Sequence, residues 1–360
     1  MKTLKALFLS LVCLVWGMFL GAQPVVAATV QVGTCLPGVK SYSTIGKAVG
    51  SVTAGSTVKV CPGTYPEQVN IFKPLTLEGV QSGNSDRAVI AAAGAILASN
   101  IDSIFGDPIV AQVLADAAGT VNISNITVDG TGNNQNGLVD IVGIFYASGT
   151  SGTVNGVTTH DQSGNGRGYG IWAENGNATL ESVMIENCDI HDVDFEGIFV
   201  GSNQRPPTLT ATVKANMIAV APATGVFYGI YDEAAGSITN NLIATGNISA
   251  GNAASNTVLS NTISVGVIGV SQFGATVKFN TIFNIFNSLK PAIALSSSSA
   301  TVESNTIKDA FIGIYLGCQP GNTVSGNTIS DARYGITGVP SSQTVTNTYH
   351  NVDIIRTGGC

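Results

Sequence analysis

Residues 258–282 read VLSNTISVGVIGVSQFGATVKFNTI and contain the same six-residue motif twice, at Val258–Ile263 and Val277–Ile282. The motif is an apolar residue, two variable residues, Asn, one variable residue and Ile. Six copies occur between residues 213 and 329, and their Asn residues are Asn216, Asn241, Asn261, Asn280, Asn305 and Asn327. Spacings of 25, 20, 19, 25 and 22 residues between these Asn residues are typical of a solenoid built from stacked coils.

The two apolar residues of each motif are five positions apart. A straight strand places only every second side chain on one face, so an odd separation cannot bury both. The chain must therefore turn a corner between them. We expect Asn at that corner, because it tolerates left-handed backbone and bonds nearby backbone groups. Stacked corners would also let the amides hydrogen-bond to one another, which predicts an Asn ladder in a parallel β-solenoid.

The ladder position continues towards the N-terminus without Asn. Residues 185–190 align with the motif and put Cys188 at this position, and the two preceding coils put Val157 and Ile126 there. We therefore expect Cys188 to be a buried, inert thiol; a reactive cysteine is the alternative. A second motif, Gly followed by two apolar or aromatic residues in most copies, predicts the next strand of each coil at Gly143, Gly170, Gly197, Gly229, Gly313 and Gly335.

The start of the chain adds a third pattern. An amphipathic stretch at residues 44–49 is followed by Pro62-Gly63-Thr64-Tyr65 and by short apolar runs at residues 69–71 and 75–79. Together with the repeats, this start resembles the right-handed parallel β-helix proteins of the pectin-lyase-like superfamily, which includes NosD-type proteins with PbH1 repeats. The resemblance implies an all-β fold, a single-stranded right-handed parallel β-helix (solenoid) with a short N-terminal capping helix.

The resulting domain plan has an N-terminal cap and first coils in residues 29–80 and β-helix repeats in residues 81–360. Residues 81–118 fit the period least well and predict a loop or an irregular coil. The fold does not fix the function, because related scaffolds host lyases, hydrolases, esterases, epimerases, adhesins and binding proteins.

Composition excludes several classes of protein. The 360 residues are 44% hydrophobic but only 10% charged, with a net charge of −7. This charged fraction is far below the roughly 25% of ordinary domains, and no Lys/Arg cluster is present. A disordered tail, a coiled coil and a conventional nucleic-acid binder are excluded, and we expect no nucleic-acid partner.

The first 28 residues predict a signal peptide. Lys2 and Lys5 precede an apolar stretch at residues 6–20, and Val26-Ala27-Ala28 offers small residues for cleavage. An uncleaved anchor is the alternative, but the stretch is shorter than the ~20 residues of a membrane span. We expect a secreted or periplasmic protein that starts near Thr29 and has no membrane span after cleavage.

Export permits disulfides, and five cysteines remain after cleavage. The sequence does not fix their pairing. We expect Cys35 to pair with Cys61 near the start and Cys318 with Cys360 at the C-terminus, which leaves Cys188 unpaired.

Two histidines occupy the same place in consecutive coils. His160 and His191 each come three residues after the ladder position, and Asp161 and Asp192 each come four after. One coil earlier the equivalent of the histidines is Asp129. We expect these side chains to stack at the strand spacing of about 4.8 Å. Such a cluster predicts acid–base chemistry on a sugar chain, because imidazole titrates near neutral pH.

An acidic run follows the second histidine. The alternation of residues 192–197 predicts Asp192, Asp194 and Glu196 on one face of a strand, with Asp189 nearby. These four carboxylates are the candidate ligands of a hard cation such as Ca²⁺; a transition metal held by His and Asp residues is a second possibility. Arg167, in a Gly-rich loop, is expected over the same surface, where it would neutralise a uronate carboxylate.

Aromatic residues supply candidate sugar-binding positions. Trp172, Phe199 and Tyr231 are expected to bind substrate together with Asp129, although residues of this strand motif also serve as core. The tetrapeptide Asp189-Ile-His191-Asp192 is similar to the Asp-Pro-His-Asp motif of alginate epimerases on this fold, with Ile190 in place of Pro. The motifs of polygalacturonases and pectin methylesterases are absent.

The sequence thus predicts a secreted β-helix that binds or processes an extracellular polysaccharide or a cell-surface glycan, by lyase, epimerase or hydrolase chemistry on a lateral groove. The alternative is a non-enzymatic, adhesin-like surface protein that binds glycans or cations. A purely structural role for the His-Asp pairs is also open, because Lys308-Asp309 and Ser330-Asp331 occupy equivalent turns.

Overall fold

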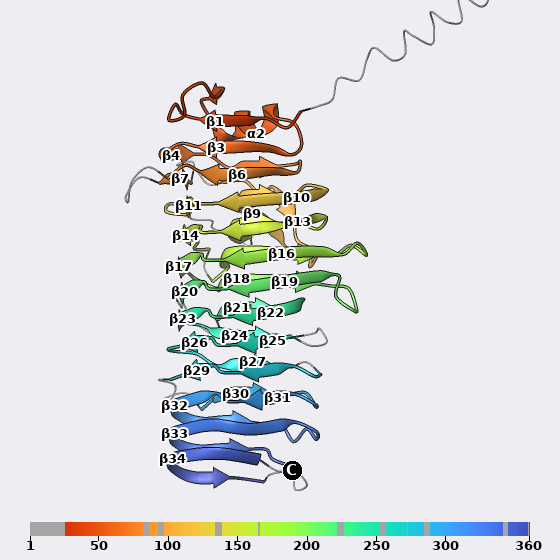
Figure 1. Ribbon diagram of the computed structural model, residues 1–360, viewed down its shortest axis with the longest axis vertical. Coiled ribbons are helices and arrows are strands. Elements are labelled where there is room, and N and C mark those ends of the chain that lie inside the picture. Colours follow the sequence, from red (N-terminus) through yellow and green to blue (C-terminus); the bar gives the residue numbers. More distant parts are fainter. Residues whose placement is uncertain are drawn as a thin grey trace, which may run out of the picture.

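The computed structural model describes residues 26–360 except 82–86, 93–96, 134–138, 165, 222–226, 252–255, 272, 284–288, 341–344 and 359. Residues 1–25, which hold most of the predicted signal peptide, lie outside the described part. Strands stack into one elongated solenoid that runs from the N-terminal cap to the C-terminus (Figure 1). Within the described ranges, no helix combines the length and the apolar character needed to cross a membrane.

Each coil contributes one strand to each of three columns of parallel strands. The first column consists of β1 (Thr29–Val32), β3 (Ser56–Val60), β6 (Leu75–Gly79), β10 (Gly119–Ser124), β13 (Thr150–Asn155), β16 (Glu181–Glu186), β19 (Leu209–Lys214), β22 (Ala235–Thr239), β25 (Thr257–Leu259), β28 (Thr276–Lys278) and β31 (Thr301–Glu303).

The second column follows the ladder position. It consists of β4 (Gly63–Pro66), β7 (Ala88–Ala91), β11 (Ile126–Asp129), β14 (Thr158–His160), β17 (Asp189–Val193), β20 (Met217–Val220), β23 (Leu242–Thr245), β26 (Thr262–Ile263) and β29 (Thr281–Ile282).

The third column carries the Gly motif. It consists of β5 (Val69–Ile71), β9 (Pro108–Ala115), β12 (Asp140–Tyr146), β15 (Gly168–Asn175), β18 (Glu196–Ser202), β21 (Tyr228–Asp232), β24 (Asn247–Ala250), β27 (Ile268–Val270) and β30 (Pro291–Leu295). At the C-terminal end, β32 (Thr306–Tyr315), β33 (Thr323–Thr337) and β34 (Val345–Arg356) bend across more than one column.

Aliphatic side chains fill the interior in register. In the third column the pairing places nine isoleucines above one another, all fully buried: Ile144, Ile171, Ile198, Ile230, Ile248, Ile268, Ile293, Ile314 and Ile336. The glycines of the second motif make room for this packing. A Cβ at Gly170 would lie 2.5 Å from Ile190 Cγ2, and one at Gly197 would lie 2.6 Å from Ile218 Cγ2.

The Asn ladder is confirmed. Each ladder Asn donates through Nδ2 to Oδ1 of the next over 2.8–3.0 Å, from Asn216 through Asn327. Asn347 extends the ladder by one coil beyond the six copies of the motif. The expectation of left-handed backbone at the Asn itself is wrong. The preceding residue takes that conformation, as at Ala215, Ser260 and Phe279, because this turn points the Asn side chain into the core.

The N-terminal cap has the predicted helix. α2 (Ile45–Ser51) buries Ile45, Ala48 and Val49, and Thr44 caps its first turn by accepting from Lys47 N. Glu67 accepts from the backbone N–H groups of Ile45 and Gly46. The helix covers apolar core that the first coil would otherwise expose.

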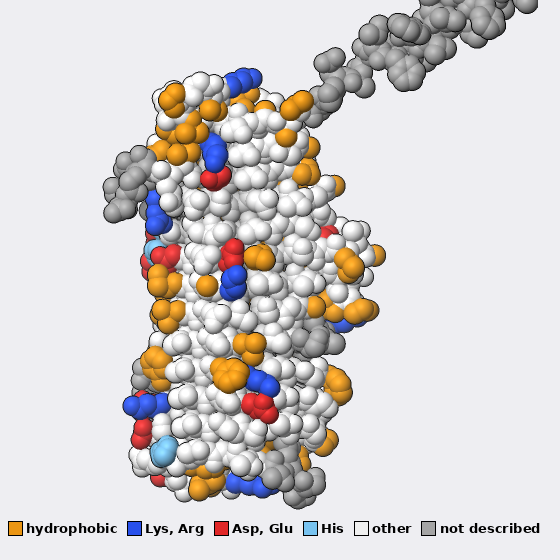
Figure 2. All heavy atoms as spheres, viewed as in Figure 1, with side chains coloured by type: hydrophobic (Ala, Val, Ile, Leu, Met, Phe, Trp, Pro, Cys, Tyr) orange, Lys and Arg blue, Asp and Glu red, His pale blue; other side chains and the backbone are white. Residues whose placement is uncertain are grey.

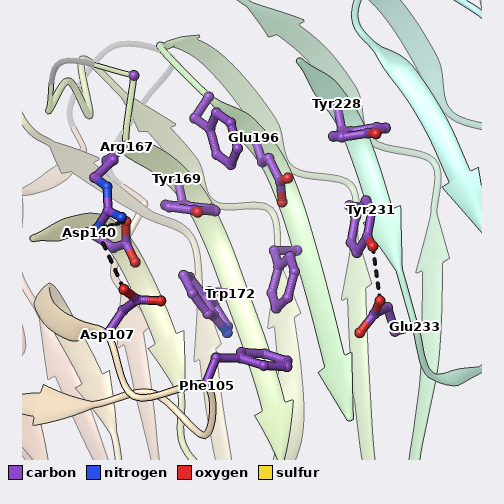
Figure 3. Close-up of a pocket in the computed structure, with 13 residues that line it drawn as sticks. Phe105, Asp107, Asp140, Arg167, Tyr169, Trp172, Glu196, Tyr228, Tyr231 and Glu233 are labelled. Atoms are coloured by element: carbon purple, nitrogen blue, oxygen red, sulfur yellow. Dashed lines mark hydrogen bonds and ion pairs between the residues drawn. The ribbon is translucent and has the colours of Figure 1, made fainter. Parts of the chain in front are cut away.

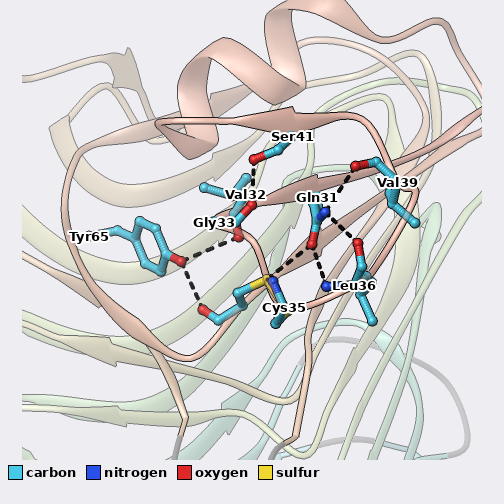
Figure 4. Close-up of a disulfide and its surroundings, with 9 residues drawn as sticks. Gln31, Val32, Gly33, Cys35, Leu36, Val39, Ser41 and Tyr65 are labelled. Carbon is cyan, nitrogen blue, oxygen red and sulfur yellow. Dashed lines mark hydrogen bonds between the residues drawn. A yellow bond between two sulfur atoms is a disulfide. The ribbon is translucent and has the colours of Figure 1, made fainter.

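Both expected disulfides are present, Cys35–Cys61 and Cys318–Cys360. At the N-terminal bridge, Gln31 Nε2 donates to two carbonyl groups of the adjacent loop (Figure 4). Cys188 is unpaired and buried, and burial raises the pKa of its thiol to about 12, so it has the inert character expected of it.

Residues 97–107, between β7 and β9, leave the regular path, as expected for part of the 81–118 segment. β8 (Ile101–Asp102) pairs antiparallel with β9, and the remaining short strand, β2 (Ser41–Tyr42), pairs with β1. The turn that follows β8 brings residues 103–107 against the outer face of the third column. One face of the wall shows few charged side chains and mostly uncharged polar groups and backbone (Figure 2).

Candidate functional site

The His-Asp cluster has the predicted register, at the C-terminal ends of β11, β14 and β17 in the second column. Asp129 pairs with His160, and His160 pairs with His191. The two imidazole rings are parallel, with centroids 5.1 Å apart. His160 Nδ1 lies 2.6 Å from Asp161 Oδ2, and His191 Nδ1 lies 2.8 Å from Asp192 Oδ2. We call these five residues the His/Asp corner.

The backbone accounts for the aspartates of this corner. Asp161 and Asp192 have φ of 56° and 54°, in the left-handed region that Asp and Asn tolerate best among residues other than Gly. Asp309 and Asp331 at the equivalent turns adopt the same conformation. Corner geometry is therefore sufficient to explain the aspartates, whether or not the corner also has a chemical role.

The acidic run does not form a single face. Because Asp192 is left-handed, β17 ends at Val193 and the chain enters β18, in another column, at Glu196. The expected alternation across residues 192–196 is therefore wrong. Asp194 Oδ1 and Oδ2 accept from Ser163 Oγ and from the backbone N–H groups of residues 164, 166 and 168, so this carboxylate holds the Gly-rich loop in place.

One group in the described part of the chain could hold a metal ion. One ligand atom each from Asp129, His160 and Asp161 lies within 4.8 Å of the others. The four residues expected to bind Ca²⁺ do not converge in this way: Asp189 and Asp192 lie on β17, Asp194 holds the loop, and Glu196 is buried on β18.

An open groove of about 620 Å³ lies on the outer face of the third column. We call it the aromatic groove, and its lining residues are Phe105, Asp107, Asp140, Gly166, Arg167, Tyr169, Trp172, Phe195, Glu196, Phe199, Tyr228, Tyr231 and Glu233. Figure 3 shows ten of them labelled, contributed by successive strands and by the turn after β8. Five of the predicted site residues therefore lie together here: Arg167, Trp172, Glu196, Phe199 and Tyr231.

Strand register builds the aromatic floor of this groove. Trp172 pairs with Phe199, and Phe199 pairs with Tyr231. The rings of Trp172 and Phe199 are 4.5 Å apart, and those of Phe199 and Tyr231 are stacked 5.5 Å apart. Tyr169 packs against Trp172 at 4.6 Å. The coil spacing thus produces a continuous row of aromatic faces along the solenoid axis.

Ionisable groups surround this floor. Arg167 Nη1 lies 3.3 Å from Asp140 and 3.7 Å from Asp107. Burial raises the pKa of Asp140 to about 6, although the Arg167 charge opposes the shift. Burial, with the nearby Asp140 and Glu233 charges, raises the pKa of Glu196 well above its usual range. Glu196 is only 4% exposed, and its Oε2 has no hydrogen-bond partner among the described residues.

A buried carboxyl group holds one wall of the groove in place. Glu174 accepts from Ile104 N at 2.9 Å and from Trp172 Nε1 at 3.0 Å. Burial raises its pKa to about 7. Glu174 therefore links the turn after β8, which carries Phe105 and Asp107, to the aromatic floor.

The structure divides the predicted site into two parts. His160, His191, Asp161, Asp192 and Asp129 lie at the His/Asp corner, and none of them lines the aromatic groove. Arg167 faces Asp107 and Asp140 rather than the histidines. The groove residues that the sequence did not single out are Phe105, Asp107, Asp140, Tyr169, Phe195 and Glu233. Glu233 had a signal, because it closely follows the Gly motif at Gly229; Asp107 had none, because it follows the irregular β8.

Comparison with known proteins supports the architecture. The profile of the family described as right-handed β-helix region matches residues 169–351, just over half of the chain. The chain belongs to the right-handed β-helix family. Its predicted handedness and fold class are thereby confirmed together with the parallel columns.

Solved structures show the same fold at low sequence identity. The A-module of mannuronan C-5 epimerase AlgE6 from Azotobacter vinelandii is 16% identical, with a TM-score of 0.55 over 86% of this chain and 88% of that one. A mannuronic acid-specific family 6 polysaccharide lyase from human gut microbiota is 13% identical, with a TM-score of 0.50 over 89% and 82% of the two chains. No curated protein matches the sequence of this β-helix.

Proposed function

We propose that this β-helix protein is secreted, binds an extracellular polysaccharide in the aromatic groove and cleaves it there. The observation that carries the proposal is the combination, in one groove, of a row of aromatic side chains with the buried carboxyl group of Glu196, whose Oε2 has no hydrogen-bond partner among the described residues. Proteins of similar fold that act on mannuronan or mannuronic acid polysaccharides support a polysaccharide as the ligand. Two disulfides fit an extracytoplasmic location.

The aromatic floor is suited to sugar binding. Phe199 and Tyr231 present stacked ring faces at adjacent coil positions, and the apolar C–H faces of pyranose rings pack on such surfaces. Their rigid side chains lose little conformational entropy on binding. We assign these two residues the role of orienting consecutive sugars along the groove, and the buried Trp172, 3% exposed, the role of supporting Phe199.

Glu196 is the proposed proton donor. Burial raises its pKa and so favours the protonated carboxyl group, the form that an acid needs in order to protonate a glycosidic oxygen. Figure 3 shows Glu196 between the Arg167–Asp107–Asp140 cluster and the Tyr231–Glu233 pair. Arg167 then acts by holding Asp140 and Asp107 in position.

A glycan panel tests this proposal. The exported protein is incubated with uronate, neutral and amino polysaccharides, and both new reducing ends and unsaturated products are measured. We expect new reducing ends with one class of glycan and none with Glu196→Gln, whereas Glu303→Gln, in a partly exposed ion pair with Lys278 outside the groove, keeps full activity. Binding without any product would favour the non-enzymatic, adhesin-like alternative. The absence of both binding and product would contradict the proposal.

The His/Asp corner is a second candidate site, for a divalent cation. The convergence of Asp129, His160 and Asp161 favours it. An imidazole nitrogen with two carboxylates suits Zn²⁺ or Mn²⁺ better than Ca²⁺, which takes oxygen ligands. Such an ion would give this corner a chemical role of its own. The alternative role is acid–base chemistry by the imidazoles of His160 and His191, paired with Asp161 and Asp192.

Calorimetric titration with Zn²⁺ tests whether the His/Asp corner is a cation site. We expect one equivalent of Zn²⁺ to bind, and His160→Ala to abolish the binding. The matched control is His350→Ala, because His350 occupies the equivalent place in the last coil, next to Ser330, without the acidic partners of His160. Equal Zn²⁺ binding by both variants would remove the cation site from consideration.

A further inference from the structure

We propose that the aromatic groove selects a polysaccharide whose sugars carry amino groups and rejects the uronates on which the similarly folded epimerase and lyase act. This inference rests on the proposed function of the groove. It concerns the charge of the ligand, which the shared fold leaves open.

The groove has an excess of carboxyl groups. Among its described lining residues, Asp107, Asp140, Glu196 and Glu233 are acidic, and Arg167 is the single Lys or Arg. The Arg167 guanidinium faces Asp140 and Asp107. Its charge is therefore already engaged by this chain, and no second Lys or Arg of the described lining remains for the carboxylate of a uronate.

The carboxyl groups lie on both sides of the position where cleavage is proposed. Asp107 and Asp140 stand with Arg167 on one side of Glu196, and Glu233 stands beside Tyr231 on the other (Figure 3). A sugar bound on either side of Glu196 thus lies next to an acidic side chain. A protonated amine there is attracted, and a carboxylate is repelled, with an energy that is larger in a partly desolvated groove than in water.

The raised pKa of Glu196 is consistent with this excess of negative charge in the groove. The charges of Asp140 and Glu233 add to burial in raising its pKa, so the groove already resists one more negative charge. Glu196 Oε2 is buried and lacks a hydrogen-bond partner in the described part of the chain. That orphaned atom marks where a polar atom of the ligand completes the site.

The charge preference also restricts the reaction. β-Elimination and C5 epimerisation both draw on a carboxylate at C5 to acidify the proton that leaves, and an amino sugar without that carboxylate cannot undergo them. Hydrolysis needs no such group. One water adds across the glycosidic C–O bond: its oxygen bonds to the anomeric carbon, the departing oxygen takes the proton of Glu196, and a water proton returns to the protein.

Trp172 provides a direct readout of binding. The chain has two Trp residues, and Trp16 lies in the predicted signal peptide, so Trp172 is the single Trp of the exported protein. Its fluorescence is titrated at low salt and about pH 6, where amines are protonated, with equal-length oligomers of glucosamine, N-acetylglucosamine and galacturonate. We expect the glucosamine oligomer to bind about tenfold more tightly than the galacturonate oligomer, with a ratio that falls as salt is added.

Variants identify the groups responsible. Glu233→Gln is expected to reduce the glucosamine-to-galacturonate ratio severalfold, and Glu303→Gln, outside the groove, is expected to leave it unchanged. Equal or tighter binding of galacturonate, or equal binding of glucosamine and N-acetylglucosamine, would overturn the amino-sugar inference while a Trp172 response keeps the groove as a glycan site. No response to any of the three would count against the proposed function itself.

Discussion

The coils before Asn216 and the coils after it form the corner between the first and second columns with different residues at the ladder position. In the N-terminal group the ladder position holds Ile126, Val157 and Cys188, with spacings of 31, 31 and 28 residues up to Asn216. In the C-terminal group it holds Asn, with spacings of 19–25 residues. The N-terminal group also has the longer third-column strands: β12, β15 and β18 have seven or eight residues, whereas β24 and β27 have four and three.

The difference separates the residues that specify the fold from those that build the site. The short coils have few residues beyond those of their strands and corners. Their Asn amides hydrogen-bond the corner of each coil to the corner of the next. Long coils use their additional residues for the loop that carries Gly166 and Arg167 and for the turn after β8, which form the walls of the aromatic groove. The groove then ends at β21, in the first of the Asn coils.

Removal of an amide from the middle of the ladder should have the largest effect. Asn261 accepts from Asn241 N and Asn241 Nδ2 and donates to Ile238 O and Asn280 Oδ1. Asn261→Ala removes the side-chain partner of Asn241 N and of Ile238 O, while Asn241 Nδ2 keeps Val213 O and Asn280 Oδ1 keeps the backbone N–H of residue 261. At about 1–3 kcal/mol for each buried group that loses its partner, we expect a loss of about 3 kcal/mol or more in the free energy of unfolding. Chemical denaturation measures it.

The control for this variant is Cys188→Ala, at the same position in a long coil. It removes one buried sulfur atom and its weak hydrogen bonds to Val154 O and Glu186 O, and we expect a loss of only about 1–2 kcal/mol. Equal losses in the two variants would show that the amide chain adds nothing to the corner.

Glu196→Gln should have the next largest effect, and on activity rather than stability. The protonated carboxyl group and the amide have the same charge and nearly the same shape, so the fold is kept. Loss of a general acid typically lowers kcat by 10²–10⁴-fold. Steady-state kinetics on the glycan identified above provide the test, and a variant with unchanged kcat would exclude Glu196 as the proton donor.

The long coils should also account for most of the pH dependence of stability. Burial raises the pKa of Glu174 and Glu181 to about 7, so the folded state holds these protons more tightly than the unfolded chain does. Stability is therefore full below the unfolded pKa and falls as pH rises from about 4 through 7. For the buried Glu174 alone we expect a loss of about 3 kcal/mol.

The midpoints of urea denaturation at acidic and alkaline pH measure this decrease in stability. Glu174→Gln should reduce the slope with pH, while Glu186→Gln, which removes the surface pair with Lys214, should keep the slope of the unchanged protein. Stability that rises with pH in this range would contradict the assignment of protonated carboxyl groups.

Conversion of one corner type into the other should have the smallest effect. Cys188 N already donates to Asn216 Oδ1 over 2.9 Å, as each ladder Asn does to the next. Cys188→Asn should therefore add a further amide to the ladder and change the free energy of unfolding by less than about 1 kcal/mol. A loss as large as that of Asn261→Ala would show that the long coils cannot accept the Asn corner.

The sequence predicted the fold well because the ladder position is a local signal. Every copy of the motif carries its own Asn and its own isoleucine, so the columns, the cap at residues 44–50 and the register of His160 with His191 could all be read from spacing. Asn347 was missed because its coil lacks the residue that turns the corner elsewhere, and the pairing shifts between Ser325 and Thr328.

The site was only partly predictable, because a groove depends on distant segments. Trp172, Phe199 and Tyr231 follow the Gly motif and were identified from it. Asp107 reaches the groove through the turn after β8, which has no repeat pattern, and Asp140 acquires its character from burial beside Arg167. The two clusters were expected to form one surface because spacing along the chain does not reveal that a left-handed Asp192 separates their columns.

The directionality of the amide ladder also has an evolutionary consequence. Every ladder Asn presents Oδ1 to the coil before it and Nδ2 to the coil after it, so all coils between Asn216 and Asn347 offer interchangeable faces. Excision or duplication of one whole coil, such as the 19 residues from Asn261 up to Asn280, rejoins the same pair of partners. Unequal recombination that adds or removes one whole coil after β21 would thus lengthen or shorten the wall and leave the aromatic groove, which ends at β21, unchanged.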